Sequence, residues 1–119
     1  MYNIKYKKVG EVMSFSINSK LLDAMVLSIV QREETYGYKI TQDIRDAMDV
    51  SESTLYPVLR RLQKGECLET YDREYMGRNR RYYKVTSKGD ELLEVYRDDW
   101  YDYKAKVEKI LINGVVNNG

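Results

Sequence analysis

Apolar residues recur at steps of three and four along the first half of the chain, which is the spacing of one helix face. Three segments show this pattern, at 19–30, 40–48 and 51–62. Ser19 stands in the N-cap position of the first segment, and Gly65 follows the third. The pattern therefore predicts three helices.

The third predicted helix has an apolar face and a polar face, and it contains a proline. Proline is tolerated mainly in the first turn of a helix, where backbone N–H groups lack partners. Either Ser53 or Thr54 is therefore the N-cap, or the helix bends at Pro57. The residues that we expect to be buried are Leu55, Val58, Leu59 and Leu62. The residues that we expect on the opposite face, with Arg61 toward its side, are Ser53, Tyr56, Pro57, Arg60 and Lys64.

After this helix the pattern changes to two short extended runs, 67–71 and 81–86, which are rich in aromatic and β-branched residues. The basic, glycine-containing connection between them predicts a β-hairpin. Two strands alone are marginal in water, so the hairpin must pack against the helices. Because side chains alternate along a strand, Tyr82 and Tyr83 should point to opposite faces, and we interpret both as structural.

A last helix is predicted from Thr86 or Ser87 to about Ile112. Its apolar positions follow each other at steps of 3, 4, 3, 4 and 3. This is the seam of a coiled coil rather than the broader face of a helix that lies on its own domain, so we expect a dimerisation helix. The predicted dimer-interface residues, including three from the first helix, are Leu21, Leu22, Met25, Leu93, Tyr96, Trp100, Tyr103, Val107 and Ile110.

The order of these elements predicts a mainly α fold with a small β-hairpin, namely a winged helix-turn-helix over 19–86 followed by a dimerisation helix over 87–112. We expect a poorly ordered leader over 1–18 and a frayed tail over 113–119. Such a module places its recognition helix, here the third, in the major groove of double-stranded DNA, and its wing along the backbone. The predicted DNA-binding residues are Ser53, Thr54, Tyr56, Pro57, Arg60, Arg61, Lys64, Arg78 and Arg80.

The composition excludes several kinds of chemistry. The 119 residues include no histidine and one cysteine, which excludes a disulfide framework, a zinc site of Cys and His ligands, and a nucleophile activated by His. No glycine loop that cradles phosphate is present either, so we expect no enzyme, cofactor or metal site. The most apolar run, 24–31, is far shorter than the roughly 20 residues of a membrane span, and we expect a cytoplasmic protein without a membrane partner.

Charge is unevenly distributed, although Lys plus Arg number 20 and Asp plus Glu number 19. The stretch 78–88 holds five basic residues and no acidic one, whereas 90–109 holds seven acidic and four basic residues. A basic hairpin tip beside a basic helix face is typical of a surface that binds nucleic acid. The alternative is that these arginines form a solvated hairpin end.

Individual roles follow from the chemistry of the side chains. Tyr56 would donate its hydroxyl to a phosphate, and Arg60 would reach a base edge or a phosphate. Arg78 and Arg80 would follow the backbone or enter a minor groove. The other interpretation of Tyr56 is that it packs on its own domain.

Four blocks of the chain resemble the signature of the PadR family of bacterial transcriptional regulators. They are Tyr36-Gly-Tyr38, Thr54-Leu-Tyr-Pro-Val-Leu-Arg-Arg-Leu62, Gly77-Arg-Asn-Arg-Arg-Tyr-Tyr-Lys-Val-Thr86, and Gly89. The resemblance extends over roughly 21–112 and implies a homodimeric winged-helix repressor on a palindromic promoter site. In two places the chain departs from the family: Glu66 stands where a glycine is usual, which predicts a shifted turn, and Met76 stands where a second glycine is common, which predicts a stiffer tip.

The short C-terminal part, one long helix with Trp100, resembles the small PadR subfamily that includes the multidrug-sensing regulator LmrR. This resemblance implies a ligand pocket near the dimer axis. There Trp100, Tyr96 and Tyr103 would bind a planar aromatic or cationic effector. The alternative is that Trp100 only fills the dimer core.

Two classes of function remain open at this point. The first is a DNA-binding repressor, and the second is a winged-helix protein-interaction module without its own operator, because a fold alone does not determine a function. The arginines of the wing and of the third helix favour DNA.

Overall fold

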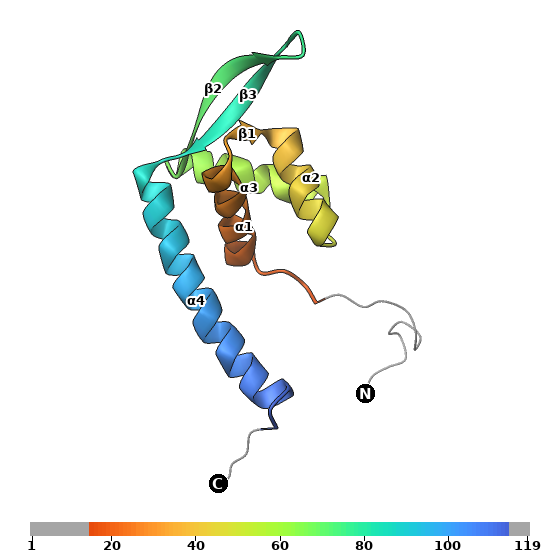
Figure 1. Ribbon diagram of the computed structural model, residues 1–119, viewed down its shortest axis with the longest axis vertical. Helices are drawn as coiled ribbons and strands as arrows, with labels where there is room; N and C mark the ends of the chain where they lie inside the picture. The colour runs from red at the N-terminus through yellow and green to blue at the C-terminus, as the bar shows by residue number, and fades with distance from the viewer. Residues whose placement is uncertain (1–14, 115–119) are drawn as a thin grey trace.

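The computed structural model describes residues 15–114 and contains four helices and a small antiparallel sheet. The expectations about 1–14 and 115–119 lie outside the described residues. The elements are α1 (Ser19–Arg32), β1 (Thr35–Tyr36), α2 (Gly37–Ala47), α3 (Glu52–Lys64), β2 (Leu68–Tyr75), β3 (Arg78–Val85) and α4 (Ser87–Leu111). The predicted fold class, mainly α with a winged helix-turn-helix, is confirmed (Figure 1).

The helix caps differ in part from those predicted. Asn18 rather than Ser19 caps α1, because its side chain accepts hydrogen bonds from the next amides along the chain. Ser51 caps α3 by accepting from the amide of Thr54, so neither Ser53 nor Thr54 is the cap. Pro57 therefore lies within the helix rather than in its first turn, where it leaves one carbonyl of the preceding turn without a helical partner.

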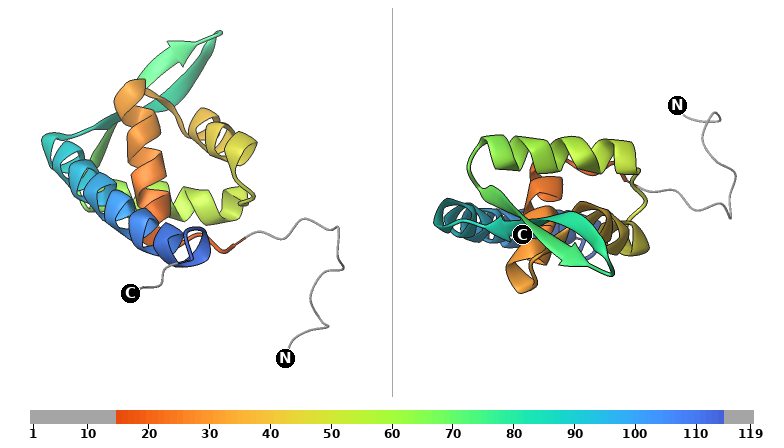
Figure 2. Two further views of the ribbon diagram at one scale, coloured as in Figure 1. Left: turned by 60° about the horizontal axis from the view of Figure 1, so that its bottom comes forward. Right: turned by 90° about the horizontal axis from the view of Figure 1, so that it is seen from above.

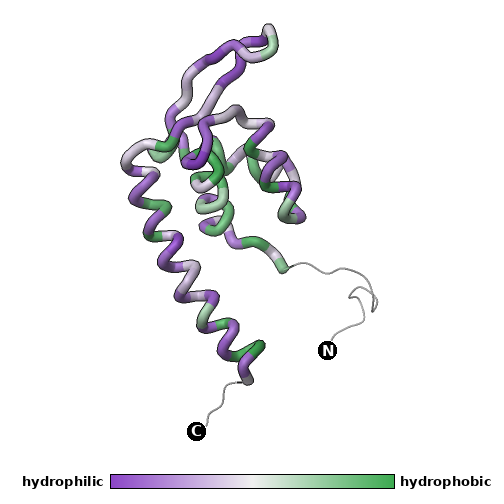
Figure 3. The backbone as a smooth tube through the Cα atoms, in the orientation of Figure 1, coloured by the Kyte–Doolittle hydropathy of each residue, from purple (hydrophilic) through white to green (hydrophobic). Residues whose placement is uncertain are grey.

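The core lies between α1, α2, α3 and the base of the sheet. Val26 and Leu27 of α1 are completely buried, and all four apolar positions predicted to face inward on α3 are buried as well. Leu22 and Leu93, which were predicted at the dimer interface, belong to this core at 4% and 1% exposure, so each is covered within its own chain. Figure 3 shows apolar residues at intervals along α4 as far as its C-terminal end.

The sheet has three strands in the order β1-β3-β2, rather than the two predicted. The added strand is only two residues long, Thr35–Tyr36, which pair with Tyr83 and Tyr82. The hairpin turns at Met76 and Gly77, both at positive φ, as a two-residue turn of this kind requires. Glu66 also has a positive φ of 64°, so a left-handed residue follows Gly65 at the position where the family usually has glycine.

Helix α4 begins where it crosses the base of the hairpin. Thr86 caps it by accepting from the amide of Gly89, and the Thr86 hydroxyl donates to the carbonyl of Glu66 at 2.7 Å. A Cβ atom on Gly89 would collide with the carbonyl oxygen of Cys67 and lie 2.7 Å from Cγ1 of Val85. The absence of a side chain at Gly89 is therefore what lets the helix approach the hairpin so closely.

From this crossing α4 runs beside α1 and extends beyond it (Figures 1 and 2). The 25 residues of α4 span about 37 Å and the 14 of α1 about 21 Å, at 1.5 Å per residue. Polar contacts join the parts that lie side by side, since Gln31 donates to Asp90 at 2.9 Å and Arg97 donates to Ser28 and Gln31. Of the helices in 15–114, none combines the length and the apolar character that crossing a membrane requires.

Candidate nucleic-acid interface

The outer face of α3 is an exposed helix surface with basic side chains. Ser53, Pro57, Arg60 and Lys64 are exposed, as predicted from the spacing, and Thr54 is exposed as well. Among residues 15–114, neither Arg60 nor Lys64 takes part in an ion pair. This face thus presents two cationic side chains that no ion pair within the described residues neutralises.

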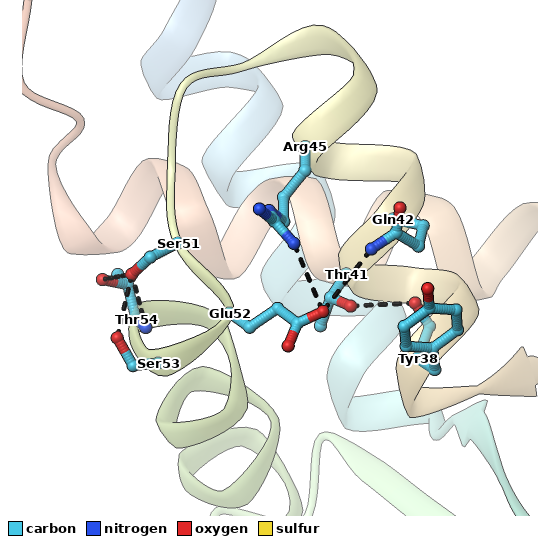
Figure 4. A network of polar contacts seen from close by, with 8 residues as sticks. All are labelled: Tyr38, Thr41, Gln42, Arg45, Ser51, Glu52, Ser53 and Thr54. Atoms are coloured by element: carbon cyan, nitrogen blue, oxygen red, sulfur yellow. Dashed lines mark hydrogen bonds and ion pairs between the residues drawn. The ribbon is translucent and has the colours of Figure 1, made fainter.

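A polar network fixes the start of α3 against α2 (Figure 4). The carboxylate of Glu52 accepts from Arg45 at 3.2 Å and from Gln42 at 3.5 Å. At the cap, the hydroxyl of Ser51 lies 3.0 Å from the hydroxyls of both Ser53 and Thr54. The two helices of the helix-turn-helix are therefore joined by charged side chains, and the first turn of α3 is held by the cap.

Tyr56 is half-buried because its ring packs against the beginning of α2. A Cβ atom on Gly37 would lie 3.3 Å from Cε1 of Tyr56, so the glycine allows this approach. Tyr83 of β3 borders the same place: burial raises the pKa of its hydroxyl, and the guanidinium groups of Arg81 and Arg60 lower it. The wing, which is the hairpin of β2 and β3, therefore meets α3 at Tyr83, and we call the hairpin face that carries Tyr83 its inner face.

The side chain of Arg61 binds α1 and does not join Arg60 on the outer face of α3. Its guanidinium pairs with the carboxylate of Asp23 on α1, which also accepts from the hydroxyl of Tyr96 on α4 at 3.3 Å. Burial and the neighbouring Asp23 carboxylate raise the pKa of Tyr96. Sequence reasoning missed Asp23, whose signal was a lone acid on the apolar α1 helix, between Leu22 and Ala24.

The wing has two chemically different faces. On the outer face the cross-strand pairs are Tyr75 with Arg78, Arg73 with Arg80, Tyr71 with Tyr82, and Glu69 with Lys84. On the inner face they are Glu74 with Asn79, Asp72 with Arg81, Thr70 with Tyr83, and Leu68 with Val85. The predicted residues Arg78 and Arg80 thus share a face, together with Arg73, which sequence reasoning missed because the first predicted strand ended at residue 71.

The three predicted ligand-binding residues lie together at the junction of α1 and α4. Tyr96, Trp100 and Tyr103 line one side of a cavity of about 320 Å³, and Leu21 and Ala24 line another. Trp100 is 41% exposed and Tyr103 is 64% exposed. The cavity is therefore open, with aromatic rings along one side.

Comparison with known proteins places this arrangement in a family. A family model for PadR-like transcriptional regulators matches residues 26–95. A protein of Streptococcus mutans with a solved structure is 34% identical, with a TM-score of 0.81 over 89% of this chain and all of that one. The PadR-like transcriptional regulator of Bacillus cereus is 33% identical, with a TM-score of 0.72 over 77% of this chain and 92% of that one.

An uncharacterized protein of Lysinibacillus sphaericus is 33% identical over 92 residues, which are 73% of this chain and 84% of that protein. Members of the matched family regulate transcription and are not enzymes. Because the family model spans more than half of the residues, the chain belongs to the PadR-like family of transcriptional regulators.

Proposed function

We propose that this chain is a cytoplasmic, homodimeric repressor that binds a palindromic promoter site and is released by a planar aromatic or cationic ligand. The observation that carries the proposal is the exposed face of α3, on which Arg60 and Lys64 have no carboxylate partner within 15–114. Division into a DNA-binding unit at 19–86 and a dimerisation helix at 87–112 is part of the same proposal.

In this proposal α3 enters the major groove and the wing follows the backbone. Arg60 reaches a base edge or a phosphate, Lys64 binds a phosphate, and Tyr56 donates its hydroxyl to a phosphate while its ring stays on Gly37. Ser53, Thr54 and Pro57 contact the duplex at the beginning of the helix. Arg61 supports α3 through Asp23, and a DNA contact by Arg61 would require that pair to open.

A mobility-shift experiment with DNA from upstream of the protein's own gene tests this function. Arg60→Ala or Arg78→Ala should abolish specific retardation, whereas Lys106→Ala should not, because Lys106 pairs with Asp102 on the distal part of α4. With six or more phosphate contacts, affinity should fall about 10³-fold or more between 50 and 200 mM salt. No retardation at low salt would favour the alternative, a protein-interaction module.

The homodimer is supported by the apolar side chains that α4 leaves uncovered. Trp100, Tyr103 and Ile110 are exposed at 41%, 64% and 72%, and Val107 lies on the same stripe. Of the other predicted interface residues, Leu21 and Met25 are only partly buried on α1. In a dimer paired through this surface, each α3 helix would bind one half-site, with the two half-sites about 34–36 Å apart.

Ligand release is supported by the cavity between α1 and α4 and by the resemblance to the LmrR subfamily. Tyr96 both lines the cavity and donates to Asp23, which in turn holds Arg61 on α3. A ligand that moves the Tyr96 ring would therefore disturb a contact of the recognition helix.

The single tryptophan of the chain makes this site directly observable. Planar cationic dyes should quench Trp100 fluorescence at micromolar concentration and weaken retardation of the DNA. If no dye of a panel quenched the fluorescence, the ligand site would be excluded and Trp100 would be assigned to the dimer core.

A further inference from the structure

The outer face of the wing contains an arrangement that β-sheets usually avoid. Arg73 and Arg80 stand directly opposite each other in the ladder, and like charges in such pairs destabilise a sheet. Within 15–114 neither arginine forms an ion pair, and the Nε atom of Arg80 is buried without a hydrogen-bond partner. The chain therefore concentrates positive charge here without neutralising it.

Aromatic rings hold both guanidinium groups in place. Cζ of Arg80 lies 4.4 Å from the ring centre of Tyr36 and 5.7 Å from that of Tyr75, and Cζ of Arg73 lies 4.9 Å from that of Tyr82. The rings also pack on each other, since the centres of Tyr36 and Tyr82 are 5.7 Å apart. Each arginine thus has a fixed position rather than the freedom of a solvated side chain.

The cluster is tied to the helix-turn-helix as well as to the wing. Tyr36 belongs to β1 and immediately precedes α2, so its stack with Arg80 connects that helix to the hairpin. On the other side of the cluster Tyr71 donates its hydroxyl to Glu34 at 2.7 Å, which raises the pKa of Tyr71. The orientation of the arginines is therefore set relative to the helices that carry the reading surface.

We propose that the outer face of the wing is a phosphate-binding surface, with Arg73 as a further DNA contact beside Arg78 and Arg80, and with Tyr36, Tyr75 and Tyr82 as positioning residues. This rests on the proposed DNA binding. Stacking occupies the flat face of a guanidinium and leaves its N–H edge for an acceptor. Because no carboxylate within 15–114 pairs with either stacked arginine, these N–H groups are available to an acceptor from a partner, and phosphate matches the N–H fork of arginine.

The first test measures how salt weakens binding to a labelled duplex of mixed sequence, which requires no knowledge of the operator. Each phosphate contact contributes about 0.9 to the slope of log affinity against log salt, so Arg73→Gln should reduce the slope of a dimer by about 1.8. Lys106→Gln removes one charge on α4 and should change nothing.

An unchanged slope for Arg73→Gln, with a reduced slope for Arg78→Gln, would overturn the role of Arg73 and leave the proposed function standing. If the unaltered protein failed to bind any duplex at low salt, both proposals would be overturned.

The second test separates positioning from simple support of the fold. Tyr36→Leu should weaken binding about tenfold in the unaltered protein and hardly at all in Arg80→Gln, while Tyr36→Phe should keep full affinity. Tyr75→Leu offers the same comparison at a more exposed ring, at 43%, should the Tyr36 variant unfold. If Tyr36→Leu weakened DNA binding equally in the unaltered protein and in Arg80→Gln, the rings would only support the fold, and the proposal would be overturned.

Discussion

The two halves of α4 carry the same kind of apolar stripe in opposite surroundings. In the first half, up to Arg97, Gly89 and Leu93 are buried and polar side chains bind α1. In the second half, from Asp98, the stripe continues through Trp100 and Ile110, which are exposed, and the ion pair formed there joins Lys106 to Asp102 of the same helix. Periodicity therefore identifies a face that will be covered, but not whether the cover is the same chain or another.

Replacing one leucine by alanine in each half tests whether the two halves contribute differently to stability. Leu93→Ala should lower the free energy of unfolding by about 3 kcal/mol, because it opens a cavity in the core, whereas Leu111→Ala, at a position 68% exposed, should cost about 0.5 kcal/mol or less. Urea unfolding followed by circular dichroism measures both. Equal losses would mean that the halves are not energetically distinct.

A second substitution tests how the first half is anchored. Gly89→Ala should cost about 2 kcal/mol, since the new methyl group collides with the Cys67 carbonyl and backbone must shift. Lys88→Ala, one residue earlier and exposed, is the matched control. Thermal unfolding should separate the two variants by several degrees, and coinciding midpoints would show that α4 can move away from the hairpin at little cost.

In the second half, substitution should affect association rather than folding. Ile110→Asp should raise the dimer dissociation constant about tenfold or more, since it places a charge in the surface proposed to pair. Sedimentation at several protein concentrations measures this, with Lys109→Ala as the neighbouring control. An unchanged dissociation constant would exclude Ile110 from the interface.

The smallest expected effect lies at the boundary between the halves. Tyr96→Phe removes the hydrogen bond to Asp23 but keeps the ring and the Arg61 pair, so it should cost about 1 kcal/mol. Tyr101→Phe, at a ring 66% exposed, should cost nothing measurable in the same unfolding experiment. A loss as large as that of Leu93→Ala would mean that the Asp23 network, not apolar burial, anchors α4.

Much of the fold was predictable because it depends on local patterns. The helices, the hairpin and the buried side of α3 follow from spacing within single segments. Strand β1 could not be predicted in this way, because a segment of two residues shows no period. Its pairing with Tyr82 and Tyr83 depends on residues that are distant in the sequence. The Asp23 network joins three helices, so no single segment contains its signal.

The candidate site was predictable to a similar extent. The outer residues of α3 could be assigned because burial of their neighbours leaves only one exposed face. Arg73 could not, because its significance comes from standing opposite Arg80, which only the register of the strands reveals. The seam of α4 was assigned wholly to a partner because the spacing at Leu93 and at Ile110 is the same.

The separation of charge between the wing and α4 has a consequence for the encounter with DNA. Residues 68–85 carry five basic and three acidic side chains, and 87–111 carry five basic and seven acidic ones; the two segments extend toward opposite ends of the molecule (Figure 1). A chain with a net charge of only +1 thereby acquires a substantial electric dipole. Near a polyanion this dipole exerts a torque that turns the wing toward the duplex before any contact forms, so orientation is selected during approach.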